Sequence, residues 1–123
     1  MTDPSPPLPP LPKHTFHATQ RDADCLVAEA AEDARFRPLP DLKPANNAVR
    51  MIVGMWYASG SLAFPRGWVM SVMLACRAAG AQHPSATCLR WYRSKVRDAP
   101  MYFAGMRGVP RELLVQLEQD VEV

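Results

Sequence analysis

The placement of proline constrains this chain more than any other feature of its sequence. The chain has 13 prolines in 123 residues, of which six lie in the segment 4–12 and three in the segment 38–44. Proline fixes φ and has no backbone N–H, so neither cluster can form the interior of a helix or a central strand. The other four stand singly, at Pro65, Pro84, Pro100 and Pro110. The folded part must therefore be built from short segments between single prolines.

The two proline clusters divide the chain into three predicted parts. Residues 1–18 are expected to form a proline-rich, disordered leader, residues 19–45 a helix followed by a proline-rich linker or arm, and residues 46–123 a helical core domain. The leader contains PPLP twice, at 6–9 and 9–12, and favours polyproline II. Such repeats resemble ligands of aromatic-lined grooves, so segment 4–12 is a candidate site for a protein partner. A plain semi-rigid leader is the alternative.

Apolar residues recur at three- and four-residue spacing between the prolines, which is typical of amphipathic helices. The sequence predicts a mostly α fold, a small bundle of about four helices with a helix-turn-helix-like pair at 65–80 and 85–97. Segment 48–58 is apolar nearly all round and is expected at the centre, with Asn46 or Asn47 as its cap. Segment 101–108, in which two glycines follow Met-Tyr-Phe, is a candidate for a short β-hairpin.

Segments 65–80 and 85–97 carry the signals of two helices joined by a short break. Pro65 fits the first helical position, and Gly80 fits a helix end. Pro84 interrupts the helical pattern, and Ser85 can cap the second helix. The small residues before the break resemble the close-packed turn of helix-turn-helix proteins. The break at 81–84 is, however, a residue or two longer than the usual turn.

The second helix of this pair carries four basic residues around Trp91. At 100° per residue, its arginines lie opposite an apolar side formed by Leu89, Tyr92 and Val96. A guanidinium group can bridge two acceptors on a guanine edge or two phosphate oxygens. A solvated helix face and a protein contact are the alternatives. We expect nucleic-acid contacts from Ser85, Thr87, Arg90, Trp91, Arg93, Lys95 and Arg97, with Arg66, Arg77 and Arg107 as further basic contacts.

Positive charge is concentrated in the middle of the chain. The formal net charge is +2, but residues 46–108 carry eight Lys or Arg against a single carboxylate, Asp98, and the segments on either side are net acidic. A basic middle suits a polyanionic partner such as DNA or structured RNA. It equally suits an acidic protein surface or the chain's own acidic segments.

The sequence contains no motif that supports an enzyme. It has no glycine-rich phosphate loop, nucleophile elbow or zinc-protease motif. Cys25, Cys76 and Cys88 lack metal-site spacing, so we expect no metal, no cofactor, and free cysteines in buried positions. No apolar run is long enough to span a bilayer and no signal peptide is recognisable, so the protein is expected to be soluble and cytoplasmic, without a membrane partner.

The function predicted from these patterns is a small DNA-binding regulator of transcription, in which Arg90 reads bases and the other basic residues contact phosphates. One helix buries too little surface for tight specific binding, so a homodimer is expected. The leucine-rich 110–121 helix either pairs with a second copy or covers the core. The alternative function is a protein-interaction adaptor or an accessory subunit of a larger, nucleoprotein assembly, whose proline-rich N-terminal segment wraps a partner.

Overall fold

The computed structural model describes residues 20–122, which form five α-helices and one short 3₁₀ helix. In chain order these are α2 (Gln20–Glu32), α3 (Pro44–Ser59), α4 (Trp68–Ala78), α5 (Ala86–Asp98), η1 (Pro100–Phe103) and α6 (Arg111–Glu122). The predicted mostly α fold is confirmed. None of these helices combines the length and the apolar character that a bilayer crossing requires. The leader predicted at 1–18 lies outside the described residues.

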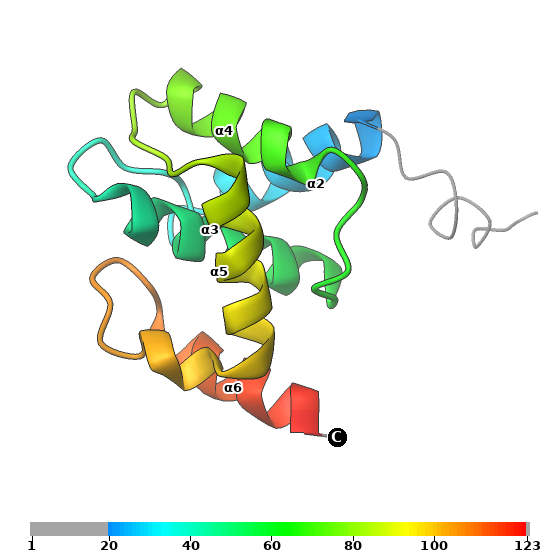
Figure 1. Cartoon of the computed structure of the whole chain (residues 1–123), viewed down its shortest axis with the longest axis vertical. Coiled ribbons are helices and arrows are strands. Elements are labelled where there is room, and N and C mark those ends of the chain that lie inside the picture. Colours follow the sequence, from blue (N-terminus) through cyan, green and yellow to red (C-terminus); the bar gives the residue numbers. More distant parts are fainter. Residues whose placement is uncertain (1–19, 123) are drawn as a thin grey trace, which may run out of the picture.

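The central helix of the fold is α3. Every residue from Asn47 to Trp56 is buried, as expected for a helix that is apolar nearly all round. α2 and α4 pack together at one end of the molecule, α5 crosses α3, and α6 packs with η1 at the other end (Figure 1). Ala23, Val27 and Phe36 belong to the same buried cluster as the later helices, so residues from the predicted 19–45 segment contribute to the common core.

α3 begins earlier than the sequence suggested. Pro44 lies in its first turn, where a missing N–H costs no hydrogen bond, and Lys43 precedes it without a side-chain cap. Asn47, expected as a cap, is instead buried within the helix. Its Nδ2 donates to the carbonyls of Leu39 and Gln82 at 3.1 and 2.9 Å, and its Oδ1 accepts from the Leu39 N–H at 2.9 Å. Asn47 therefore fixes two irregular segments to the central helix.

Residues 101–108 do not form the hairpin considered from the sequence. The N–H groups of Tyr102 and Ala104 donate to the carbonyls three residues back, at 3.0 and 3.1 Å, and η1 buries Phe103. Pro100 begins this turn because its fixed φ suits a helical start. The hairpin prediction was wrong, and residues 20–122 contain no strand.

The leucine stripe of α6 covers the core. Leu113, Leu114 and Leu117 are each at most 3% exposed. α6 contacts η1, α3 and α5 of its own chain. A homodimer through the 110–121 helix would therefore have to use other residues of that helix.

Candidate nucleic-acid interface

α5 begins as the sequence predicted. Ser85 has an extended backbone, with φ −69° and ψ 166°, and its hydroxyl accepts a hydrogen bond from the Cys88 N–H at 3.2 Å. This bond satisfies one of the N–H groups that a helix start leaves unpaired. Leu89 and Val96 anchor the helix and have no exposed surface. These two buried residues fix the orientation of α5, so its other side chains point away from the core in a defined direction.

The helix before α5 and the break between them depart from a standard helix-turn-helix. α4 begins at Trp68 rather than at Pro65, because Gly67 precedes it with a left-handed φ of 88°. Gly80 has the left-handed φ, 68°, that the sequence predicted after α4. The break spans residues 79–85, which exceeds the usual turn of three to four residues. α5 also packs more extensively on α3 than on α4.

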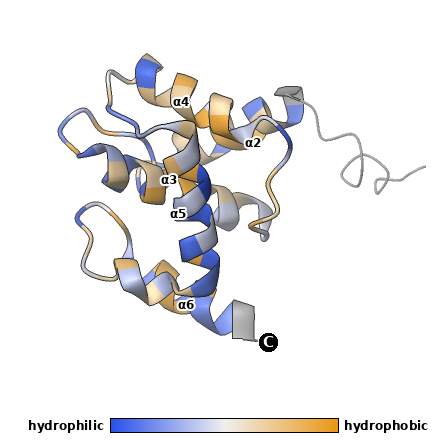
Figure 2. Cartoon of the chain, viewed as in Figure 1, coloured by the Kyte–Doolittle hydropathy of each residue, from blue (hydrophilic) through white to orange (hydrophobic). Residues whose placement is uncertain are grey.

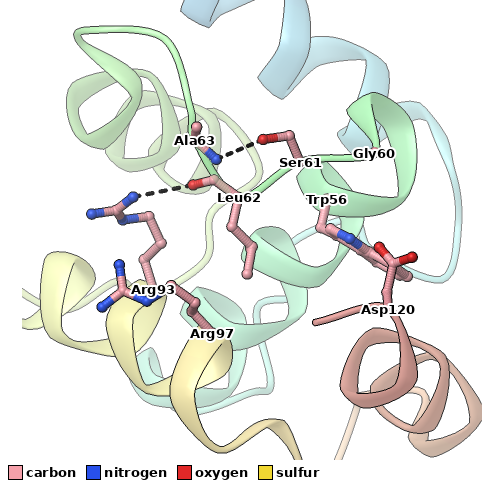
Figure 3. Close-up of a pocket in the computed structure, with 8 residues that line it drawn as sticks. All are labelled: Trp56, Gly60, Ser61, Leu62, Ala63, Arg93, Arg97 and Asp120. Carbon is pink, nitrogen blue, oxygen red and sulfur yellow. Dashed lines mark hydrogen bonds between the residues drawn. The ribbon is translucent and has the colours of Figure 1, made fainter. Parts of the chain in front are cut away.

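A basic cleft lies between α5 and the loop 60–67. It contains two adjoining pockets that share Arg93. The first has a volume of about 300 Å³ and includes Trp56, Leu62, Arg97 and Asp120 in its lining (Figure 3). The second has a volume of about 620 Å³. Its lining includes Arg66 and Arg90 over an apolar wall of Phe64, Trp68, Met70 and Met73.

Arg93 joins the loop to α5. Its Nη1 donates to the Leu62 carbonyl at 3.1 Å, while its Nε is buried without a hydrogen-bond partner among the described residues. The guanidinium groups of Arg93 and Arg97 lie on the same side of Leu62, whereas Asp120 lies on the other side, beside Trp56 (Figure 3). The pocket is therefore lined by two positive groups, an arrangement that favours an anion.

Arg66 and Arg90 are the two freely exposed arginines of the cleft. Arg66 lies in the loop before α4, and Arg90 lies on α5, about one turn after the Ser85 cap. Within residues 20–122 neither guanidinium makes a hydrogen bond or an ion pair. Both groups can therefore accept an anionic partner without first breaking a contact within the protein.

Arg97 and Lys95 make weak contacts at the surface. Arg97 Nε donates to Asp98 Oδ1 at 3.0 Å, which raises the pKa of the guanidinium and lowers the pKa of the Asp98 carboxyl. Lys95 Nζ lies 4.5 Å from the centre of the Tyr102 ring. An ion pair at the surface is screened by water, and a cation–π contact with an exposed ring is weak. Phosphate groups could replace either contact at little cost.

The outward surface of α5 carries Thr87 and Trp91. Thr87 is exposed, and Trp91 is 50% exposed with its ring against the edge of Tyr92, the two centroids 5.3 Å apart. Tyr92 itself is partly buried, in agreement with its predicted place on the apolar side. The exposed ring of Trp91 therefore lies on α5 next to the exposed Arg90 in the sequence.

Three of the predicted basic residues, Arg77, Lys95 and Arg107, line neither pocket of the cleft. Arg77 Nε donates to His83 Nε2 at 3.3 Å. Arg107 pairs with Asp41 at 2.9 Å, and its carbonyl accepts from Asn46 at 2.7 Å. The structure therefore brings Arg66, Arg90, Arg93 and Arg97 to one cleft, but not Arg77, Lys95 or Arg107.

Sequence reasoning missed the apolar wall of the cleft. Trp68 is buried and Met73 packs against the core, as their helical spacing favours, but nothing in that spacing indicated that Met70 would line a pocket. The available signal was the absence of charge from Trp68 to Cys76, which allows an apolar residue on every side of α4. The spacing alone could not say which of these residues would find a packing partner.

Among residues 20–122, no three His, Cys, Asp or Glu side chains are grouped so that they could hold a metal ion. No protein-family model, curated protein or solved structure matches the chain. The function must therefore be argued from the cleft and its charges.

Proposed function

We propose that this protein is a non-enzymatic DNA-binding protein that acts as a transcriptional regulator through α5 and the basic cleft beside it. The observation that carries the proposal is the row of Arg66, Arg90, Arg93 and Arg97 along one cleft. Asp120 is the one carboxylate among the described residues that line the two pockets. Such an excess of positive charge attracts a polyanion and concentrates it at the cleft.

Arg90 has the base-reading role in this proposal. It is exposed near the start of α5 and has no partner within the described residues. The N-terminal part of a recognition helix comes closest to base edges in a major groove, and an arginine can bind guanine O6 and N7 together. Ser85 and Thr87, which precede Arg90 at the same end of α5, would contact the flanking bases or phosphates.

The other basic residues position the protein on the phosphate backbone. Arg66 is free, and Lys95 and Arg97 make only weak surface contacts. Arg93 holds the loop 60–67 against α5 and adds its charge to the cleft. Phosphate contacts of this kind fix register and orientation but carry no sequence information directly.

The test is fluorescence anisotropy with random-sequence duplex DNA and with a fragmented genomic pool. Arg90→Ala should reduce the preference for selected sequences, while Lys95→Ala should weaken binding to all sequences alike. The control is Arg111→Ala, because Arg111 is exposed on α6 and makes no ion pair within the described residues. Equal losses on every sequence for Arg90→Ala and Lys95→Ala would remove the base-reading role.

The alternative function, a protein-interaction adaptor, would use a different part of the chain. It depends on the proline-rich segment 4–12, which lies outside the described residues. Removal of residues 1–18 should leave DNA binding intact if α5 carries the function. Loss of a protein partner with unchanged DNA binding would assign the leader a separate role, and absence of DNA binding in the full chain would favour the adaptor.

A further inference from the structure

The outward face of α4 is apolar and has no packing partner in the described residues. Met70 and Leu74 lie one helical turn apart and are 51% and 50% exposed. A surface helix normally presents charged and polar residues on the side away from the core. In Figure 2, α4 is coloured largely as hydrophobic although it lies along the edge of the molecule. Two neighbouring exposed apolar side chains on one helix face are a candidate docking surface.

The face continues into the larger pocket of the cleft. Met70 and Met73 belong to that pocket, and Phe64 and Trp68 form an edge-on aromatic pair beside them, with ring centroids 5.1 Å apart. The pocket volume of about 620 Å³ is sufficient for bulky apolar side chains. Methionine side chains are flexible and adapt readily to different apolar groups. Together, α4 and the pocket form one continuous apolar surface, the α4 docking face (Phe64, Trp68, Met70, Met73 and Leu74).

The charged residues that line the pocket of the α4 docking face are all positive, whereas Asp24 of α2 accepts a hydrogen bond from Ser71 of α4. Arg66, Arg90 and Arg93 line the pocket, and Arg77 follows Leu74 by three residues on the same helix. The pocket contains no carboxylate among the described residues that line it, and the segment 60–85 contains no Asp or Glu. An occupant that buries apolar side chains here would therefore gain from carboxylates on its flanks.

We propose that the α4 docking face binds an acidic amphipathic helix of a partner protein. Leucine-like side chains at helical spacing would enter the pocket and cover Met70 and Leu74, while glutamates or aspartates of the partner would pair with Arg66 and Arg90. This is the helix-in-groove mode of recognition. A second copy of this chain is a poorer occupant, because a two-fold contact would bring the same arginines toward one another.

This inference goes beyond the proposed DNA-binding function. Leu74 lines neither pocket and has no role in DNA binding, and Trp91 and Lys95 have none in the docking face. Arg66 and Arg90 are shared, because both line the pocket and both are proposed DNA contacts. DNA and the acidic helix are therefore expected to compete, and a partner bound at α4 would lower DNA affinity.

The test uses a fluorescein-labelled model peptide with leucines along one helical face and glutamates along the other. It should bind the full chain, and the double variant Met70→Ala/Leu74→Ala should lose at least about tenfold in affinity. Both residues are half-exposed, so the variant should fold, which circular dichroism would check. Arg66→Ala should also weaken binding, Arg111→Ala should not, and a peptide with alanines in place of its leucines should bind poorly.

Several outcomes would overturn the proposal. Equal affinity of the wild type and the double variant for the peptide would show that charge alone attracts it. A wild-type dimer that the double variant converts to a monomer in sedimentation would identify a second copy as the occupant. Peptide binding that appears only after removal of residues 1–18 would identify the chain's own leader. Anisotropy with duplex DNA separates this test from the proposed function, because the single variant Leu74→Ala, which lies outside both pockets, should weaken peptide binding and keep its DNA affinity.

Discussion

Arg50 is a buried guanidinium whose partners are all backbone carbonyls. It is 7% exposed and donates to the carbonyl oxygens of Arg37, Gly108 and Ala34 at 2.6, 2.7 and 2.7 Å. Burial lowers its pKa, yet the side chain remains charged because an arginine begins from a very high value. Through these bonds, one residue of α3 fixes two loops to the core.

Replacement of Arg50 by methionine should therefore be strongly destabilising. The substitution keeps an apolar stem but leaves three carbonyl acceptors without their donor, at an expected cost of about 3 kcal/mol. Urea unfolding followed by circular dichroism would measure the loss of free energy of unfolding. The matched control, Arg111→Met on the exposed surface of α6, should change it by about 0.5 kcal/mol or less. Similar stabilities for the two variants would contradict the structural role.

Cysteine reactivity provides a second prediction at the scale of residues. Cys76 is fully buried and its burial raises the pKa of the thiol to about 11, whereas Cys25 and Cys88 are exposed. The expectation that all three cysteines are buried was therefore wrong for two of them.

Because the thiolate is the reactive form, Cys76 should remain unmodified at pH 8 while iodoacetamide labels the other two. Mass spectrometry after brief labelling, with a urea-unfolded control, would show this. Labelling of Cys76 at the same rate in the native protein would be the contrary result.

Among the elements, α3 depends on the absence of a side chain at Gly54. A Cβ at this position would lie 2.5 Å from both Cβ and Cγ of Phe36. Helix propensity alone would favour alanine over glycine by about 1 kcal/mol. Overpacking of a core typically costs about 1–3 kcal/mol, and here the contacted atoms are at the base of a buried ring that has little freedom to move. The steric cost should therefore exceed the gain in propensity.

The corresponding prediction is that Gly54→Ala destabilises the protein by about 1–2 kcal/mol. Thermal or urea unfolding would measure the change. Gly105→Ala is the control, because a Cβ at Gly105 meets no atom within 4 Å and the residue has no positive φ. A stabilising effect of Gly54→Ala would mean that the 33–37 turn can move away from α3 without cost.

The helices themselves could be predicted from short sequence patterns, whereas the residues at which they begin could be predicted less well. The Ser85 cap and the left-handed Gly80 depend on a few neighbouring residues, so they could be predicted from the sequence. Pro65 matched the rule for a helix start, but Gly67 delayed that start to Trp68. Asn47 matched the rule for a cap, but its bonds reach Gln82, which is 35 residues away in the chain. Partners that are distant in the chain therefore influence where a helix begins, and the spacing of apolar residues in the sequence does not reveal those partners.

At the scale of the whole molecule, the cleft depends on how distant segments meet. Helical spacing alone placed Arg90 and Arg97 on the same side of their helix. It could not predict that Arg93 would bind Leu62, 31 residues earlier, or that Arg107 would pair with Asp41, 66 residues away. The structure places four of the seven predicted basic residues, all of them arginines, along one cleft. It also exposes the apolar face of α4 beside them.

If these arginines bind the phosphate backbone of DNA as proposed, the affinity must depend steeply on salt. Anisotropy of a labelled duplex would be measured over a series of salt concentrations for the wild type, Arg66→Ala, Arg97→Ala and the control Arg111→Ala. We predict a steep linear fall of log affinity with log salt, with a slope that decreases by roughly 0.9 for each phosphate contact removed. Arg111→Ala should retain the wild-type slope. Absence of binding at low salt, or an unchanged slope in both cleft variants, would contradict the account.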